Sequence, residues 1–203
     1  MQGLSLKNTA LRVFDTESGK IVYTDFGEML FTHYGVSGPM ILSASAHLSG
    51  IEPGRYRLSL DLKPALDAQT LDKRLLSDFS KNQNRDFANA LTALLPQKLI
   101  PVIVRRSGID PKKKVNLVTR EERRVLVSLL KDFTLTVRCA RPVREAIVTS
   151  GGVDVRELSP KTMEAKKVPG LYFCGEVIDV DAYTGGFNLQ IAFSPARLAA
   201  ENA

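Results

Sequence analysis

The 203-residue sequence predicts an α+β fold in which a helical part interrupts a β-rich part. Three observations predict this order of elements. Apolar and polar residues alternate over 11–15 and 55–62, as they do in strands that bury one face. Apolar residues then recur at helical spacing between residues 67 and 131. Alternation returns over 133–137, so the helical part is predicted to be an insertion within the β-rich part.

Residues 1–66 are predicted to form the first part of a β-rich, barrel-like domain. Strands over 11–15 and 21–24 flank a polar turn and form a hairpin. A third strand is expected over 28–32. The strand over 55–62 is expected to bury the face formed by Tyr56, Leu58, Leu60 and Leu62.

One short helix is expected within this β-rich part, from Met40 to Leu48. Ser37 can cap its N-terminus, and Pro39 fits its first turn. Gly50 lies just past its expected end, where glycine is favoured.

Residues 67–131 are predicted to form a small helical domain. Thr119 and Glu122 have the spacing of a capping box, which predicts the start of its last helix. The other helices are expected over 67–79, 85–95 and 97–107. The apolar sides of the first and last helices hold Leu71, Leu75, Leu76, Phe79, Val125, Leu126, Leu129 and Leu130.

The chain is predicted to return to the β-rich domain over 132–147 and to end in a separate segment over 148–203. A further strand is expected over 145–149. The apolar run 171–174 lies between two glycines and is typical of a strand buried on both faces. A C-terminal helix is expected over 188–200.

The positive charge of the chain is concentrated in one segment. The net charge is +6 and the sequence pI is about 9.4, and residues 98–144 hold 13 Lys/Arg against four Asp/Glu. Two interpretations are open: a solvated surface, or a non-catalytic binding module for nucleic acid or an acidic partner. No aromatic residue lies among Lys112–Lys114, which disfavours a surface that stacks single-stranded bases. Nucleic acid is therefore not the expected partner.

Several classes of protein are disfavoured by composition. No run of about 18 apolar residues is present, so no membrane-spanning helix is expected. The N-terminus lacks the apolar stretch of a secretory signal. Cys139 and Cys174 are the only cysteines, which predicts a cytoplasmic location and no zinc site of four thiolates. Cys174 falls in the expected buried strand and should be an inert apolar residue.

The most informative pattern lies near the C-terminus. A predicted buried strand ends in Gly175 and Glu176, where a carboxylate can accept hydrogen bonds from hydroxyl groups. Gly185 and Gly186 lead into the C-terminal helix, whose free N–H groups favour an electron-rich partner. Each part alone is also compatible with an ordinary strand end or helix cap, so the ordered combination carries the signal.

This combination closely resembles the C-terminal motif of the HI0933-like (YhiN-type) FAD-dependent flavoprotein family, which includes aminoacetone oxidase-like enzymes. The segments 31–39, 107–111 and 149–153 fit the same family, in the same order. The resemblance implies a Rossmann-like FAD domain interrupted by a β-rich domain, which itself carries a small helical domain. The chain would start within the β-rich insertion, and 148–203 would be the C-terminal strand and helix of the FAD domain.

The resemblance also implies which residues contact the cofactor. Gly175 and Glu176 would lie by the ribityl and pyrophosphate groups of FAD. The isoalloxazine ring would lie along Gly185, Gly186, Phe187 and Asn188. Three further candidates have a second interpretation: Gly151 and Gly152 either approach the cofactor or end a strand, and Gln190 either contacts it or faces solvent.

His33 is the candidate catalytic residue, at the substrate side of the flavin. Histidine is a residue type that suits an acid or base near neutral pH, although a single histidine is often structural. The substrate is not indicated by the sequence. Under the resemblance, NAD(P)H is a candidate electron donor, and amine oxidation or reduction of an unsaturated substrate is the expected chemistry. No metal site is expected.

One feature of the family is absent from these residues. No Gly-x-Gly-x-x-Gly turn follows a predicted strand, although that turn supplies the amides that hold the pyrophosphate. We therefore expect FAD in the complete protein and expect the 203 residues not to hold it tightly. On this interpretation the chain is the C-terminal portion of a flavin-dependent oxidoreductase.

Overall fold

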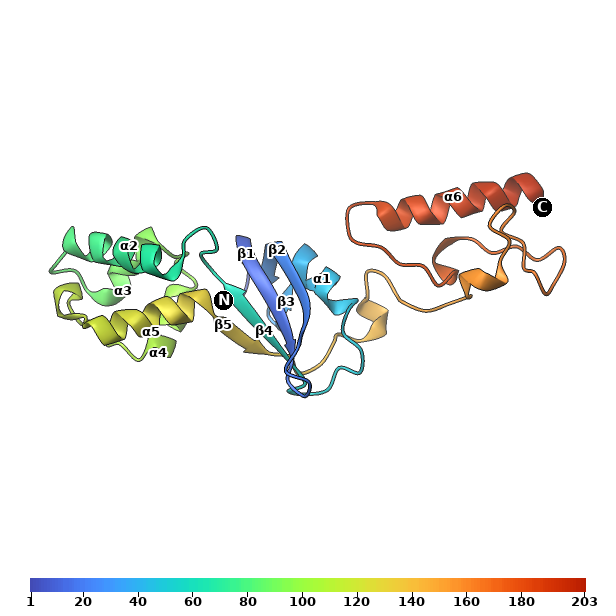
Figure 1. The fold of residues 1–203 in the computed structure, drawn as a ribbon. Coiled ribbons are helices and arrows are strands. Elements are labelled where there is room, and N and C mark those ends of the chain that lie inside the picture. Colours follow the sequence, from blue (N-terminus) through green and yellow to red (C-terminus); the bar gives the residue numbers. More distant parts are fainter. The chain divides into compact units, whose positions relative to one another are not determined.

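A five-stranded antiparallel sheet with the order β3-β2-β1-β4-β5 lies at the centre of the first of two units in the computed structural model, which describes residues 1–203 (Figure 1). The units are residues 1–139 and 140–203. The strands are β1 (Leu4–Asp15), β2 (Ile21–Phe31), β3 (Val36–Ser37), β4 (Tyr56–Asp61) and β5 (Phe133–Thr136). The α-helices of the first unit are α1 (Pro39–Ser45), α2 (Ala68–Ser80), α3 (Phe87–Ala90), α4 (Ile100–Ser107) and α5 (Arg120–Lys131), with 3-10 turns η1 (Leu91–Ala93) and η2 (Val115–Leu117).

The predicted α+β fold with a curled, barrel-like β part is confirmed. The predicted hairpin is also present, as the Asp15 N–H donates to the Lys20 carbonyl at 3.0 Å across the turn. The strands expected over 21–24 and 28–32 are parts of one strand, because β2 pairs with β1 along nearly its whole length. One register shift, between Leu6 and Thr9, is a bulge in β1.

The buried face of the sheet holds the residues expected from their alternation. Leu11 pairs with Leu60, and Val13 with Leu58, and all four are at most 4% exposed. The short helix α1 covers the same face, since a Cβ added to Gly27 would meet the Cβ of Met40 at 4.0 Å.

Helix α1 begins and ends differently from the prediction. Ser37 is not its N-cap, because Ser37 pairs with Leu30 in the sheet, and the cap position falls to Gly38. Gly38 has a φ of 96°, and a Cβ there would lie 3.0 Å from the Met29 Cα. The helix ends at Ser45, so Gly50 does not cap it.

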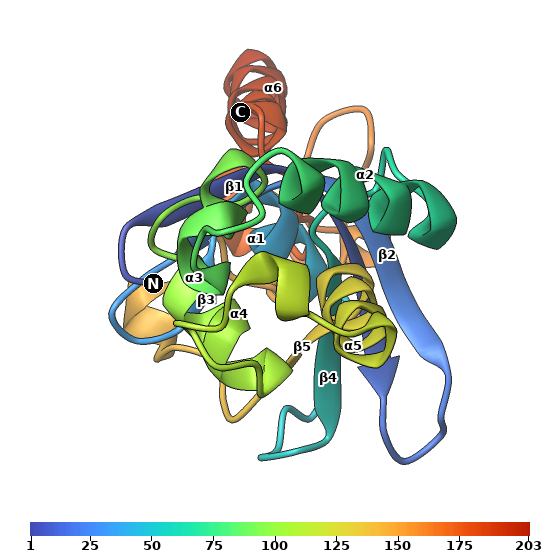
Figure 2. The same cartoon turned by 90° about the vertical axis from the view of Figure 1, so that its left-hand side faces the viewer.

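Figure 2, turned so that the helical part faces the viewer, shows α2, α4 and α5 grouped together. The predicted capping box at Thr119 and Glu122 is present at the start of α5. Helix α4 begins at Ile100 and not at residue 97, because Pro101 is tolerated only in the first turn. The helix expected over 85–95 is split into the short α3 and the turn η1.

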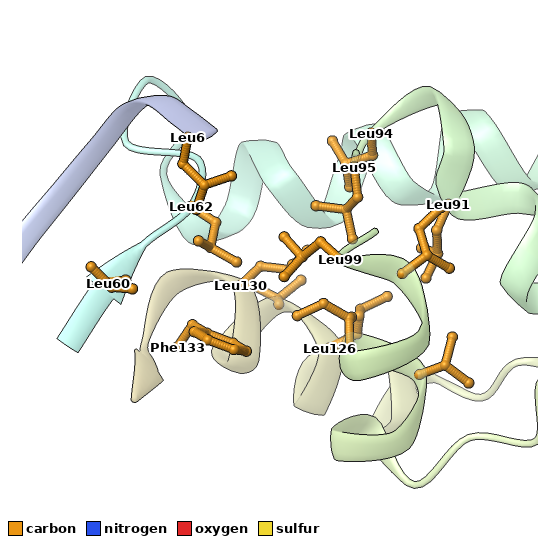
Figure 3. Close-up of a cluster of buried hydrophobic side chains, with 14 of the residues drawn as sticks. Leu6, Leu60, Leu62, Leu91, Leu94, Leu95, Leu99, Leu126, Leu130 and Phe133 are labelled. Carbon is orange, nitrogen blue, oxygen red and sulfur yellow. The ribbon is translucent and has the colours of Figure 1, made fainter. Parts of the chain in front are cut away.

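One apolar core joins the end of the sheet to the helical part. Leu6 and Leu62 lie side by side at the end of the sheet, next to Leu99 and Leu130 of the helical part (Figure 3). Two predicted core positions are wrong: Leu76 is 44% exposed and Val125 is 50% exposed. The other six predicted apolar side chains of α2 and α5 are buried or packed against this core.

The second unit contains one α-helix, α6 (Phe187–Asn202), and three 3-10 turns, η3 (Val143–Glu145), η4 (Val155–Glu157) and η5 (Gly175–Val177). Neither of its predicted strands forms. Residues 145–149 have no neighbouring strand, and Ile147 is 69% exposed. The run 171–174 is bonded on one side only, through the Ala165 N–H to the Leu171 carbonyl and the Phe173 N–H to the Met163 carbonyl.

The environment of Cys174 also differs from the prediction, because the run 171–174 does not form a buried strand. A strand buried on both faces needs neighbours on both sides. Since the run 171–174 has a partner on one side only, the Cys174 thiol is exposed and not an inert core residue. None of the helices in the chain has both the length and the apolar character to cross a membrane.

Candidate functional site

Gly152 lets two segments of the second unit pack closely together: the segment around Gly151 and Gly152, and the segment from Val177 to Asp179. Its φ is +144°, and an added Cβ would lie 2.4 Å from the Val177 carbonyl oxygen and 3.1 Å from the Asp179 nitrogen. On either side of this contact, the Val153 N–H donates to the Val177 carbonyl, and the Asp179 N–H donates to the Val153 carbonyl, at 2.8 and 2.9 Å. A side chain at position 152 would push these backbones apart.

Two aspartate side chains also link these two segments. The Gly151 N–H donates to the Asp179 carboxylate at 3.0 Å, and the Ser150 hydroxyl lies 3.5 Å from the Asp181 carboxylate. The sequence interpretation did not assign a role to Asp179. Its position four residues after Gly175 does not by itself indicate that role, because the hydrogen bond to Gly151 is visible only in the structure.

Glu176 lies in the turn η5, next to this junction, and its carboxylate has no partner in the chain. Gly175 takes a φ of +76° to begin the turn. Every other acidic side chain of the second unit accepts a hydrogen bond or forms an ion pair: Glu145, Asp154, Glu157, Glu164, Asp179, Asp181 and Glu201. Glu176 is therefore the one acidic side chain of the unit without a partner, although it lies in a turn and not at the end of the predicted strand.

The start of α6 offers backbone donors. Gly185 and Gly186 have φ values of +120° and +92°, and Gly186 is the N-cap with no side-chain hydrogen bond to the first turn. The N–H groups of that first turn are therefore uncapped by a side chain. Phe187, at the first helical position, is 60% exposed, so an aromatic ring stands beside these donors.

Asn188 and Gln190 have partners within the chain. The Asn188 side-chain amide accepts from the Ala182 N–H and donates to the Ala182 carbonyl, both at 2.8 Å, and closes the loop before α6. The Gln190 side chain donates to the Ser194 hydroxyl at 2.8 Å, on the exposed side of the helix. Both side chains therefore have a structural role, and cofactor contact by either stays a prediction.

The structure brings part of the predicted site together. Gly152 packs directly on the segment that follows Glu176, and the Gly151 N–H donates to Asp179 of that segment. Helix α6 packs beside the turn η5. His33 belongs to the first unit, in the turn between β2 and β3, where its ring contacts Tyr34 edge-on at 4.7 Å. Its catalytic role stays a prediction.

The basic segment 98–144 is partly neutralised within the chain. Lys113 pairs with Glu122 at 2.7 Å, and this bond lowers the pKa of the Glu122 carboxyl, as does the Thr119 N–H. Four more of its cations are paired: Lys114, Arg123, Lys131 and Arg141. No group of three or more His, Cys, Asp or Glu side chains is placed to hold a metal ion.

The chemical groups that the second unit presents would suit part of a flavin nucleotide. Its features are the free Glu176 carboxylate, the open N-terminus of α6 and the exposed ring of Phe187. A carboxylate suits the hydroxyl groups of a ribityl chain, and uncapped N–H groups suit the carbonyl oxygens of the ring. These residues lack the Gly-x-Gly-x-x-Gly turn that binds the pyrophosphate in dinucleotide-binding folds.

Comparison with known proteins finds curated relatives that match most of the chain. The "Ribosomal RNA dihydrouridine synthase" of Escherichia coli is 37% identical over 86% of this chain and 42% of its own length. The protein of the same name from Haemophilus influenzae is 32% identical over 84% of this chain and 41% of its own length. The "3-dehydro-bile acid delta(4,6)-reductase" of Clostridium scindens is 30% identical over 89% of this chain and 44% of its own length.

The chain thus spans a little over two fifths of each of these three relatives. The family model described as "HI0933-like protein barrel and H2TH domain" matches residues 1–148, which is most of the chain. The chain belongs to the HI0933-like protein family.

Proposed function

We propose that this chain supplies the substrate-side domains and the C-terminal flavin-contacting segment of an FAD-dependent reductase that acts on a carbon–carbon double bond. The observation that carries the proposal is the arrangement of the second unit. Gly152 fixes the segment around Glu176, whose carboxylate is the only one in that unit without a partner. A carboxylate without a partner can accept hydrogen bonds from a polar ligand, and glycines beside it allow the ligand to come close to the backbone.

The names of the relatives support the type of reaction. The names dihydrouridine synthase and delta(4,6)-reductase both denote the addition of hydrogen to a carbon–carbon double bond. The same reaction on this chain's own substrate would require a hydride and a proton, and bound flavin would supply the hydride after reduction by a donor such as NAD(P)H. Reduction is thus favoured over the amine oxidation that the family resemblance also allowed.

The residues that would hold FAD here are few. Glu176 would accept hydrogen bonds from the ribityl hydroxyls, and the first-turn N–H groups of α6 would donate to the ring oxygens. Phe187 would cover one side of the ring. Gly185 and Gly186 keep side chains away from that helix end. The pyrophosphate would be held by a dinucleotide-binding segment from outside these 203 residues.

A chimera tests the proposal. The part of the E. coli relative that this chain does not match would be joined to residues 1–203 in the order that the relative has them. The purified chimera would be given a reductant and an RNA that contains uridine, or a conjugated steroid ketone. Formation of the hydrogenated product from either substrate supports the proposal. A folded chimera that holds flavin and reduces neither would contradict it.

RNA is the substrate class that we favour. Two of the three relatives, including the 37% identical one, are named for ribosomal RNA. These names weigh against the sequence-based expectation that nucleic acid is not a partner. The alternative of a non-catalytic module that uses residues 98–144 is less favoured, since Glu122, Asp86, Asp72, Asp61 and Glu145 already pair with five of its cations.

A further inference from the structure

The sheet of the first unit has a second face, opposite the one on which Leu11, Val13, Leu58 and Leu60 are buried. On this face, the register aligns Thr24, Arg12 and Ser59 in one cross-strand row, and Phe14 and Arg57 in the next. Phe26 lies on the same face of β2, two residues beyond Thr24. We call the group Arg12, Phe14, Phe26 and Arg57 the Arg-Phe face.

The two arginines of this face have no acidic partner. The Arg12 and Arg57 guanidinium carbons lie 5.8 and 4.9 Å from the centre of the Phe14 ring, and neither forms an ion pair. Arg12 also donates weakly to the Ser59 hydroxyl at 3.4 Å. The arginines are thus held in place by an aromatic ring, and their charges remain available to an anion.

The apolar part of the face is unusually exposed. Phe26 is 61% exposed in the middle of β2, and Leu30 further along the strand is 37% exposed. Three carboxylates lie on or beside this face. Asp61 pairs with Lys131 at 2.5 Å, Glu28 accepts a hydrogen bond from Ser5 near the bulge, and Asp132 accepts one from Ser59, which is 1% exposed. An open sheet with exposed aromatic rings beside unpaired guanidinium groups has the chemistry that binds single-stranded RNA, by stacking on bases and pairing with phosphates.

We propose that the Arg-Phe face binds single-stranded RNA, with Phe26 stacking on a base and Arg12 and Arg57 contacting phosphates. The proposal rests on the proposed function for its choice of RNA as the polyanion. It places the contact on the sheet and not on the basic segment 98–144. An exposed aromatic ring would be unnecessary for a partner recognised by charge alone.

The test is the binding of a fluorescein-labelled 12-nucleotide oligouridylate to the 203-residue chain, measured by fluorescence anisotropy over a range of salt concentrations. The double variant R12Q/R57Q should raise the Kd by tenfold or more. It should also reduce the slope of log K against log salt by about 1.4, since each lost phosphate contact on a single strand changes it by about 0.7. Phe26→Ala should raise the Kd by about tenfold and leave the slope unchanged.

The matched control is R105Q/R124Q, which removes two exposed, unpaired arginines from the basic segment. It should change the Kd by less than about twofold. The proposal is overturned if this control weakens binding as much as R12Q/R57Q, or if the parent chain does not bind at about 100 µM protein in low salt. Should R12Q/R57Q fail to fold, as judged by circular dichroism, Phe26→Ala decides alone.

The outcome is independent of the flavin proposal. The binding assay contains no cofactor and uses residues of the first unit only. A chain that binds RNA through the Arg-Phe face could still fail the chimera assay, and a chimera that holds flavin could still fail to bind through this face.

Discussion

Gly152 is the residue at which the second unit has the least room for a side chain. We expect Gly152→Ala to destabilise this unit by about 2 kcal/mol or more, because the added Cβ would collide with a backbone carbonyl that cannot move alone. Hydrogen exchange of the Val153 and Asp179 amides, which bond across the junction, should accelerate by more than tenfold.

Gly151→Ala is the control for this change. Gly151 also has a positive φ, +99°, but an added Cβ there meets nothing within 4 Å. It should show only the smaller effect of backbone strain, about 1 kcal/mol. Equal effects of the two substitutions would mean that the contact with Val177 is not what makes glycine necessary at 152.

Asp154 provides a pH-dependent contact in the second unit. Hydrogen bonds from Arg156, first from its side chain and then from its backbone, lower the pKa of Asp154 to about 2. Because this folded-state pKa lies below the ordinary value of 3.8, the contribution to stability is complete above about pH 5 and is lost as the pH falls toward 2.

Arg156→Gln should bring the pKa of Asp154 back toward 3.8, as measured by NMR titration of its carboxyl carbon. Arg197→Gln is the control, since that arginine pairs with Glu201 at the far end of α6 and should leave the Asp154 titration unchanged. A titration near 3.8 in the parent chain would contradict the contact with Arg156.

At the scale of elements, α5 depends on its capping box. Thr119→Ala removes the hydroxyl that accepts from the Glu122 N–H and should destabilise the first unit by about 1–2 kcal/mol in urea denaturation. Ser128→Ala, at an exposed position on the same helix, should change stability by less than about 0.5 kcal/mol. Equal losses from the two variants would refute the role of the cap.

Helices and hairpins, whose backbone hydrogen bonds join residues close in sequence, could be predicted from the sequence. The hairpin of β1 and β2 and the capped helix α5 are examples, since the turn at Asp15 and the cap at Thr119 are local signals. The split of the 85–95 helix could not be predicted in this way. The Phe87 N–H donates to the Lys113 carbonyl, a contact far along the chain.

The run 171–174 shows the limit of local composition. Its apolar residues are typical of a buried strand, but a strand also needs partners on both edges. Within the chain only the segment near Met163 provides one. The contact of Gly152 with Val177 could not be predicted either, because no local pattern in the sequence links the two segments.

At the scale of the whole molecule, the 30-residue apolar core lies entirely within residues 1–139. We therefore expect a fragment of residues 1–139 to unfold with the same urea midpoint as the first unit does in the full chain. Circular dichroism of the fragment and the chain would show this. A midpoint that falls on removal of residues 140–203 would mean that the second unit stabilises the first.

The second unit has a different character. It buries few apolar side chains, Leu158, Ile178 and Ala199, and leaves Phe187, Leu189 and Phe193 of α6 at least 60% exposed. An exposed apolar surface of this kind marks a site of interaction. Together with the share of the relatives that the chain spans, it supports the proposal that the unit completes a larger FAD domain.

The measurement that tests the central claim most directly is the visible absorption spectrum of the chimera with the E. coli relative after desalting. We predict that flavin bands remain in the parent chimera and that Glu176→Ala, which disturbs no contact within the chain, weakens flavin retention at least tenfold. Glu157→Ala, which removes an exposed carboxylate paired with Lys167, should leave it unchanged. A folded chimera that is colourless, or one whose flavin is insensitive to Glu176→Ala, would contradict the role assigned to this segment.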